Sequence, residues 1–557
     1  MLKKPKKTIK ILLSNTLAIH SPNSSLFFFL PSFLIVAFGQ AAWFPLLAPL
    51  AALCGYALFW KAIFQKNLRS RFWLSVLWFA SVQGVQLSWM TTQDYMGPFI
   101  LLVYAGLIFL LGLQFGLLSV FITREPLTLL RCAALSGLWV IFEWLRLFLL
   151  SGFTWNLAGL SLAGNTLSLQ AASLFGVFGL SFWVLFVNLA GFRASFRRTK
   201  SSFVLFFGLA LIPYVYGFVY QKIPPQGDRF FTATLIQTSL LPEERSLFFG
   251  RPEKMIPPFQ QWETIMTLAQ DTDTDLIVLP EGTFPFTAKQ TVYPLSSLES
   301  LWKKYQWEVK ELPPLGEDSS HFAENNQWFV SNLYFAEALA NHTGSEVIIG
   351  LDDQDSPGKI FNAAFLCAPD HKPVRTEKRV LMPIAEYIPL KNWKFLSQFI
   401  LDQYGIESSF EPGQEAKISS QKIPLGILIC YEETFSELTR HLRAKGAQIL
   451  VTISNDVWFP NSRLGKQHFY HGMIRAVENG TPLLRSSNSG VTAAVDCFGN
   501  ILAMAPENEF YALTVDVPLQ TIRTPYSFWG DSAILALSAL FALTLLESVV
   551  DLRFRRF

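Results

Sequence analysis

Long apolar segments separated by short polar connections fill the first 220 residues of the chain. Seven of these segments approach the length that crosses a bilayer, and one more lies near the carboxyl end: residues 25–38, 43–60, 72–90, 99–122, 132–150, 167–192, 202–220 and 532–550. Between them, residues 221–530 change to short apolar strands, helices and turns. The pattern predicts a transmembrane helical domain of about seven spans at 1–220, an inserted domain at 221–530, and a final transmembrane helix with its tail at 531–557.

The amino-acid composition agrees with a membrane protein. Hydrophobic residues make up 51% of the chain and charged residues 16%, whereas soluble domains contain about 25% charged residues. The net charge of +3 is too small to indicate a nucleic-acid partner. The five cysteines are odd in number and widely spaced, so they predict neither a disulfide framework nor a CxxC metal site.

The distribution of basic residues predicts the orientation of the chain in the membrane. Eighteen Lys and Arg lie in one set of connections, and none lies in the alternate set of 39–43, 91–98 and 151–166. Because basic connections remain in the cytoplasm, both termini are predicted to be cytoplasmic. The domain at 221–530 is then predicted to lie outside the cytoplasm.

Two features of the membrane part exceed what anchoring requires. In "WVIFEWLR", Glu143 and Arg146 lie three residues apart within a span. Charges there are costly and are usually paired, so we expect an internal ion pair that fixes helix packing. The connection "SGFTWNLAG" that follows has two interpretations, a simple turn or the lining of a path from the bilayer to the inserted domain.

Three chemically distinct residues of the inserted domain stand out, two at predicted strand ends and one before a proline-containing loop. Cys430 ends the apolar run of "GILICYEETF", Glu281 ends that of "DLIVLPEGTFPF", and Lys378 precedes "RVLMPIAEYIPL". Reactive groups collect at strand ends in open α/β folds. A lone cysteine is more often a buried structural thiol. A carboxylate, an ammonium and a thiol together, however, can form a nucleophilic site in which the carboxylate accepts the thiol proton and the ammonium stabilises the oxyanion.

The competing hypothesis pairs the cysteine with a histidine. His441 lies in the helix predicted after Cys430, and His468 and His471 have one-turn spacing in "KQHFYHG". That spacing suits a metal, but no carboxylate accompanies it at a useful distance along the chain. We therefore expect surface or supporting roles for these histidines, and no metal or organic cofactor.

Four motifs occur in the order typical of the carbon–nitrogen hydrolase (nitrilase) superfamily: "LPEG", "EKRVLMPIAEYIPL", "GILICYEETF" and "TISNDVWF". With the spans, "FEWLR…SGFTWNLAG" and "RAVENGTPLLRSSNSGVTAAVD", the whole chain resembles the apolipoprotein N-acyltransferase family. The resemblance implies a polytopic α-helical membrane domain plus an α/β nitrilase-like αββα sandwich. It also implies that Glu281 is the general base, Lys378 the oxyanion lysine and Cys430 the nucleophile. The supporting or substrate-binding positions that match are Glu386, Tyr431, Glu432, Asn455 and Trp458.

The resemblance implies an enzyme of the bacterial inner membrane whose catalytic domain faces the periplasm. It would take an acyl chain from a phospholipid as a cysteine thioester and transfer it to the α-amino group of an apolipoprotein's S-diacylglyceryl-cysteine. It would act as a monomer without a cofactor. The alternatives are a membrane-tethered nitrilase-type amidase or hydrolase, and a transporter or receptor whose outer domain only binds ligand.

Overall fold

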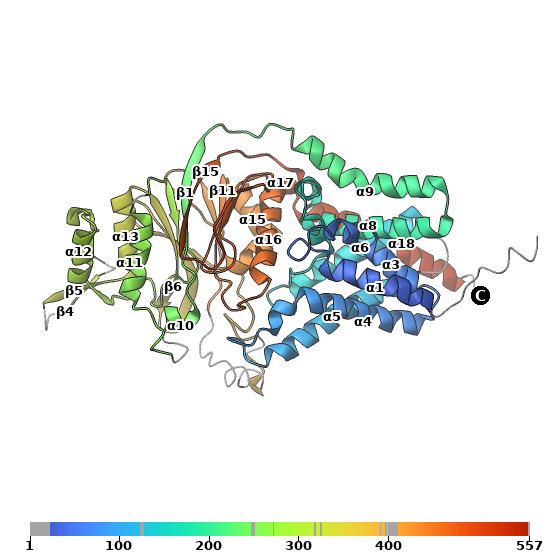
Figure 1. Ribbon diagram of the computed structural model, residues 1–557, viewed down its shortest axis with the longest axis horizontal. Coiled ribbons are helices and arrows are strands. Elements are labelled where there is room, and N and C mark those ends of the chain that lie inside the picture. Colours follow the sequence, from blue (N-terminus) through green and yellow to red (C-terminus); the bar gives the residue numbers. More distant parts are fainter. Residues whose placement is uncertain are drawn as a thin grey trace, which may run out of the picture.

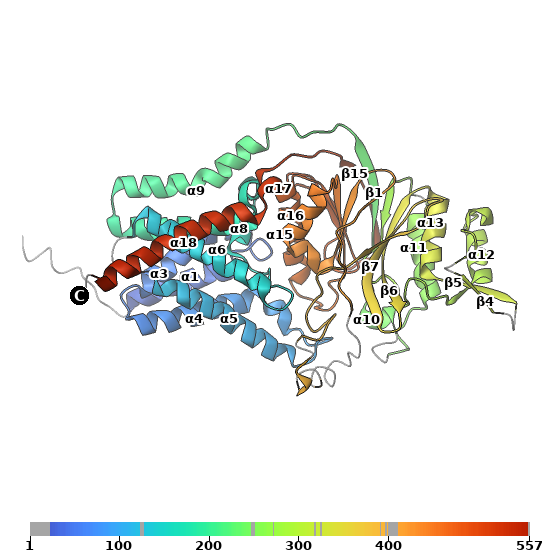
Figure 2. The ribbon, with the colours of Figure 1, turned by 180° about the vertical axis from the view of Figure 1, so that it is seen from behind.

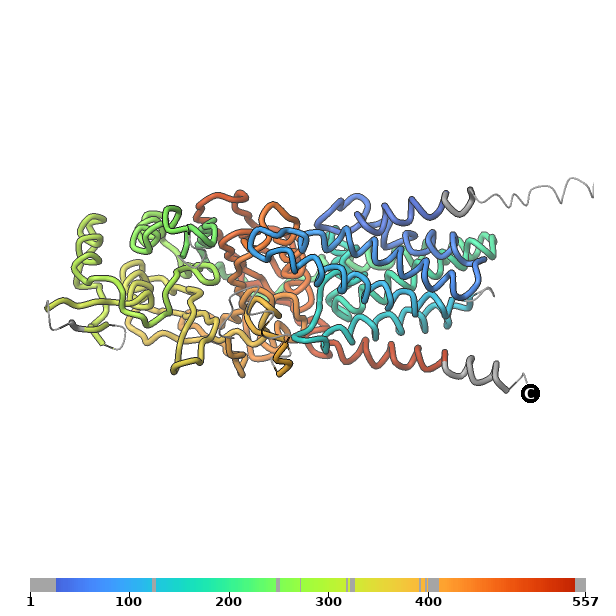
Figure 3. Tube along the Cα trace, turned by 90° about the horizontal axis from the view of Figure 1, so that it is seen from below, coloured from blue at the N-terminus to red at the C-terminus, as the bar shows by residue number. Residues whose placement is uncertain are grey.

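The computed structural model describes residues 23–122, 127–246, 251–270, 272–316, 319–322, 326–389, 392–395, 398 and 410–554. The molecule is elongated, with a bundle of helices at one end and an α/β domain at the other (Figure 1). Most helices of the bundle run along the long axis of the molecule, and α18 (Asp531–Phe554) returns beside them after the α/β domain (Figure 3).

Each apolar segment predicted from the sequence contains one or more helices. In the bundle these are α1 (Asn23–Phe38), α2 (Ala48–Leu50), η1 (Ala51–Gly55), α3 (Tyr56–Ile63), α4 (Leu68–Gln86), η2 (Ser88–Thr91), α5 (Ile100–Val120), α6 (Leu129–Leu145), η3 (Arg146–Phe148), η4 (Ala158–Leu162), α7 (Thr166–Leu169), α8 (Ala172–Arg197), α9 (Lys200–Tyr220) and α18. Among the described residues, α5, α8 and α9 are long and apolar enough to cross a membrane, by length and composition. The count of eight spans therefore stays a prediction, as does the division at 220 and 531.

The predicted ion pair between Glu143 and Arg146 is wrong, since Glu143 Oε2 and both terminal nitrogens of Arg146 have no hydrogen-bond partner in the described part of the chain. Glu143 Oε1 accepts hydrogen bonds of 2.8 Å from Trp139 Nε1 and from the Ala158 amide. Arg146 Nε donates to Gln114 Oε1 at 2.8 Å. The reason is local, because α6 ends at Leu145 and Arg146 begins a 3₁₀ turn that directs its side chain to α5.

Two six-stranded sheets form the α/β domain. The first has the order β15 (Tyr511–Pro518), β1 (Phe230–Gln237), β2 (Leu276–Val278), β6 (Glu346–Ser356), β7 (Lys359–Cys367) and β8 (Val374–Glu377). The second has the order β14 (Ile501–Met504), β13 (Ala493–Val495), β12 (Leu483–Ser487), β11 (Ile449–Ser454), β10 (Leu425–Ile429) and β9 (Ile418–Ser419). Between them lies an apolar core of alternate strand residues, including Leu235, Val278, Ile427 and Val451.

Helices cover the outer face of each sheet, which confirms the predicted αββα sandwich. On the first sheet these are α11 (Pro258–Ala269) and α13 (Asn332–Thr343), at the end far from the bundle (Figure 1). On the second sheet they are α15 (Ser436–Ala444) and α16 (Leu464–Asn479), which lie between that sheet and the membrane helices (Figure 2). Buried residues of α15 and α16 share one apolar cluster with the bundle. The domain is thus fixed to the bundle through its own helical layer.

The remaining elements are a small sheet with its helices and three short helices that follow strands. A small sheet of β3 (Tyr293–Pro294), β5 (Gln327–Val330) and β4 (Ser319–Phe322), with α12 (Leu295–Lys304) and η6 (Val309–Glu311), lies at the end farthest from the bundle (Figure 1). The short helices α10 (Pro242–Arg245), η7 (Cys430–Thr434) and α17 (Pro525–Trp529) follow β1, β10 and β15 respectively.

Candidate active site

Strand register brings Glu281, Asn362 and Lys378 into one row of the first sheet. Val278 of β2 lies opposite Ile348 of β6. Further along β6, Asp352 is paired with Asn362 of β7. The Lys378 amide, directly after β8, donates to the Asn362 carbonyl at 2.8 Å. The side chains of Glu281, Asn362 and Lys378, which are far apart in the sequence, therefore lie together at one end of these strands.

The Lys378 ammonium is held by two carboxylates. Its Nζ lies 2.9 Å from Glu281 Oε1 and 2.8 Å from Glu386 Oε1, and its side chain is 1% exposed. Burial alone lowers the pKa of Lys378, but the charges of Glu281 and Glu386 raise that pKa well above its ordinary 10.5. The ammonium is therefore a permanent positive charge in this site.

Asn362 is a member of this group that the sequence analysis missed. Its Nδ2 donates to Glu281 Oε1 at 2.7 Å and to Glu386 Oε1 at 2.8 Å, the same two oxygens that Lys378 binds. The only signal in the sequence is a polar residue within the apolar strand "KIFNAAFLC". Asn362 and Lys378 thus both donate to Oε1 of Glu281 and to Oε1 of Glu386. The other oxygen of Glu281, Oε2, is left to accept a proton.

Cys430 lies where β10 passes into η7, with its backbone in the left-handed region at a φ of 51°. L-residues other than Asn and Asp seldom adopt that conformation. Burial, and next the negative charge of Glu281, raise the pKa of the Cys430 thiol well above its ordinary 9.0, while Lys378 opposes the shift. The resting residue is therefore a protonated thiol beside a carboxylate and an ammonium, a state that needs a base before it can attack.

Glu432 fixes the distance between the lysine and the cysteine segments. Its Oε1 accepts from the Arg379 amide at 2.7 Å, and its Oε2 accepts from the Ile429 amide at 2.9 Å. These amides belong to the residue after Lys378 and the residue before Cys430. One buried carboxylate therefore holds both segments in place.

The other predicted supporting residues lie at three different places. Glu386 accepts from the Met382 amide at 2.7 Å in addition to its bonds in the charged group. Tyr431 points to the bundle, with its hydroxyl donating to the Gly152 carbonyl at 2.7 Å. After β11, Asn455 Oδ1 accepts from Asn488 Nδ2 at 3.0 Å, and Trp458 packs edge-on at 6.2 Å from Tyr95. Since β10 and β11 are parallel neighbours, this loop begins beside Cys430.

His468 and His471 are buried, with 2% and 1% of their surfaces exposed. Of the two expected roles, surface or supporting, the surface role is therefore wrong for both, because α16 lies between a sheet and the bundle. One ligand atom each of Cys430, Asp456 and His468 lies within 4.8 Å of the others. His468 and Asp456 are already hydrogen-bonded to protein partners, so we assign no metal to this group.

The connection 151–166 is neither a simple turn nor remote from the site. Thr154 Oγ1 donates to Thr434 Oγ1 at 2.6 Å, next to the bond between Tyr431 and Gly152. The ring of Trp155 packs on His468 and His471 with centroids 5.6 and 5.1 Å apart. The connection thus contacts both η7 and α16, the two elements that support Cys430.

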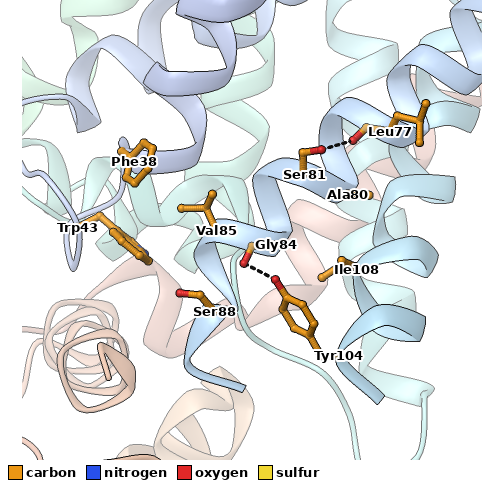
Figure 4. Close-up of a pocket in the computed structure, with 10 residues that line it drawn as sticks. All are labelled: Phe38, Trp43, Leu77, Ala80, Ser81, Gly84, Val85, Ser88, Tyr104 and Ile108. Carbon is orange, nitrogen blue, oxygen red and sulfur yellow. Dashed lines mark hydrogen bonds between the residues drawn. The ribbon is translucent and has the colours of Figure 1, made fainter. Parts of the chain in front are cut away.

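An open groove of about 620 Å³ lies at the outer side of α4 and α5. Figure 4 shows Phe38 and Trp43 on one side, Leu77, Ala80 and Val85 on α4, and Tyr104 and Ile108 on α5. It reaches Ser88, whose neighbour Trp89 packs on Phe459 of the α/β domain at 4.8 Å. The groove is therefore apolar along the bundle and ends near the domain.

The chain is similar to known proteins at two levels, a broad class and a particular family. A model described as carbon-nitrogen hydrolase matches residues 252–525, and one described as the apolipoprotein N-acyltransferase N-terminal domain matches residues 32–190. An apolipoprotein N-acyltransferase of Chlamydia caviae is 31% identical over 92% of this chain and 95% of its own. One of Chlamydia pneumoniae is 31% identical over 91% and 94%.

A solved carbon-nitrogen hydrolase from Helicobacter pylori aligns over 52% of this chain and 89% of its own, at 17% identity and a TM-score of 0.33. The chain belongs to the apolipoprotein N-acyltransferase family, and its apolar helices agree with a bacterial membrane protein. This membership argues against the transporter or receptor hypothesis.

Proposed function

We propose that this protein transfers an acyl chain from a phospholipid to the α-amino group of a diacylglyceryl-cysteine at the amino terminus of a lipoprotein. The observation that carries the proposal is the Lys378 ammonium held between Glu281 and Glu386, with the charges of Glu281 and Lys378 both acting on the Cys430 thiol. Membership of the family supplies the class of acceptor.

In the first half-reaction, Glu281 takes the proton of the Cys430 thiol, and the sulfur attacks the ester carbonyl of the phospholipid. A carbon–sulfur bond forms as the carbonyl oxygen becomes an oxyanion. The oxyanion is stabilised by Lys378 and by a backbone N–H next to Cys430, and one such donor commonly contributes about 10²–10³ in rate. The carbon–oxygen bond of the ester then breaks, and Glu281 returns its proton to the leaving lysophospholipid.

In the second half-reaction, the free amine of the lipoprotein cysteine attacks the thioester. A carbon–nitrogen bond forms, the carbon–sulfur bond breaks, and the amine proton passes through Glu281 to the Cys430 sulfur. This is ping-pong covalent catalysis with one acyl-enzyme intermediate. Water must be kept from the thioester, which favours a buried site against the membrane.

Both substrates are anchored in a bilayer, which gives the enzyme a reason for its helical bundle. The groove in Figure 4 is proposed to admit an acyl chain, since its lining is apolar and it ends near the domain. The positive-inside pattern supports a location in the inner membrane with the domain facing the periplasm. We propose that the enzyme acts as a monomer.

The transfer is tested with purified protein in detergent, a phospholipid, and a synthetic diacylglyceryl lipopeptide. Mass spectrometry should find the lipopeptide heavier by one acyl chain, linked as an amide. A lipopeptide whose amine is acetylated beforehand is the matched control and should remain unchanged. Release of free fatty acid without lipopeptide acylation would instead support the amidase or hydrolase alternative.

A further inference from the structure

We propose that His468 is a positioning residue for acyl transfer, which holds the carbonyl of Cys430 so that the following amide N–H faces the reacting carbonyl. This inference rests on the proposed function, whose mechanism uses a backbone N–H beside the nucleophile. His468 lies on α16, and its Nε2 is 3.1 Å from the Cys430 carbonyl oxygen. It therefore contacts the backbone of the nucleophile from the side of the membrane helices.

The hydrogen on the His468 ring is assigned by its neighbours. Nε2 faces the Cys430 carbonyl oxygen, and Glu433 Oε2 lies further away at 3.4 Å. Both neighbours are acceptors, so Nε2 must carry a hydrogen and donate it. This holds whether Nδ1 is satisfied by Asp456 Oδ1 at 2.9 Å or by Arg485 Nη2 at 3.0 Å.

A closed set of buried charges orients this donor. Asp456 Oδ2 accepts from Arg485 Nη2 at 3.0 Å, and Arg485 Nε lies 3.0 Å from Glu433 Oε2. Glu433 belongs to η7, three residues after Cys430. The set therefore starts and ends on the short helix that carries the nucleophile, and no member of it is more than 7% exposed.

Fixing the carbonyl also fixes the N–H of the same peptide group. The bond between Cys430 and Tyr431 is trans, since the described residues contain no cis peptide. In a trans peptide, the N–H points away from the C=O. With its oxygen turned to α16 by His468, the peptide directs the Tyr431 N–H to the opposite side. The left-handed φ of Cys430 is the conformation that this bond helps to hold.

Trp155 stabilises the ring of His468 from the membrane side. Its indole packs on the imidazole at a centroid distance of 5.6 Å and is itself 3% exposed. His471, one turn further along α16, packs on the same indole, and neither of its ring nitrogens has a hydrogen-bond partner. His471 is therefore a matched control that shares the surroundings of His468 but makes no bond to Cys430.

Two substitutions of His468 distinguish the role of Nε2 from that of Nδ1. The side-chain amide of His468→Gln reaches the place of Nε2 and keeps a donor for the Cys430 carbonyl. The amide of His468→Asn reaches only the place of Nδ1 and loses that donor. The readouts are the single-turnover rate of thioester formation on Cys430, the KM for phospholipid, the melting temperature, and alkylation of the thiol by iodoacetamide.

We expect His468→Asn to slow thioester formation about 100-fold, the usual effect of losing one oxyanion donor, with KM and thiol alkylation unchanged. His468→Gln should stay close to wild type, as should His471→Asn. If His468→Asn does not fold, His468→Met takes its place, because it matches Gln in length and lacks the donor. Equal losses in the Asn or Met variant and in the Gln variant, or no loss in any, would overturn the inference. A wild-type protein that forms no thioester would overturn the proposed function as well.

Discussion

Asn362 offers a sharp test of the charged group, because its contribution follows from two measured contacts. Asn362→Leu keeps the approximate volume and removes hydrogen bonds of 2.7 and 2.8 Å to Glu281 and Glu386. A hydrogen bond to a charged group contributes about 1.5–3 kcal/mol, so the two together contribute about 3–6 kcal/mol. If the bonds from Lys378 absorb half of this loss, about 2 kcal/mol remains, which corresponds to a rate about 30-fold lower.

The assay for Asn362→Leu is the single-turnover rate of thioester formation on Cys430, followed by intact-mass spectrometry. Asn362→Asp should be slower still, because a third carboxylate then faces the other two with one ammonium to balance them. Asn341→Leu is the control, since Asn341 Nδ2 donates to the Glu311 carbonyl away from the site. An Asn362→Leu enzyme that forms the thioester within about threefold of the wild-type rate would refute this account of the charged group.

Three further predictions concern the thiol, its support and the groove. The rate of Cys430 alkylation by iodoacetamide should rise about tenfold per pH unit from pH 7 to 9, because the pKa of the thiol is raised above its ordinary 9.0 and only a small fraction is thiolate in this range. A rate that reaches a plateau below pH 8, measured by peptide mapping, would contradict this. Glu432→Ala should lower the melting temperature and slow acylation, since each buried amide it leaves unpaired costs about 1–3 kcal/mol. Glu432→Gln keeps one acceptor and should lose less; an Ala variant as stable as wild type would argue against this role. Gly84→Phe should raise the KM for long-chain phospholipid, because a side chain there enters the groove beside Tyr104, and thiol alkylation should stay normal; an unchanged KM would exclude the groove as the lipid site.

The sequence predicted the helices of the bundle and the class of the site for clear physical reasons. A bilayer demands about 20 apolar residues per helix, and such segments are visible without knowledge of the fold. Glu281, Lys378 and Cys430 could be proposed because each lies in a motif of the family, and because Glu281 and Cys430 also end predicted strands. The structure brings Lys378 and Glu281 to 2.9 Å.

The features that sequence reasoning missed depend on pairing between distant segments. Asn362 joins the site through the register of β6, β7 and β8, which no local pattern specifies. Glu143 and Arg146 have the spacing of a helical ion pair, but the end of α6 between them separates their side chains. For His468 the sequence left a surface role and a supporting role open, and the docking of α16 against the bundle excludes the surface role by burying it. In each case the outcome depends on tertiary packing, which local spacing does not specify.

The central claim is that Cys430 carries the acyl chain between two lipid substrates. The most direct measurement is the intact mass of the purified protein after incubation with phospholipid and again after addition of the diacylglyceryl lipopeptide, with Cys430→Ala in parallel. The account predicts a gain of one acyl chain that depends on Cys430 and disappears when the lipopeptide is added. A folded protein that acylates the lipopeptide without ever gaining mass, or a Cys430→Ala variant that gains the same mass, would contradict it.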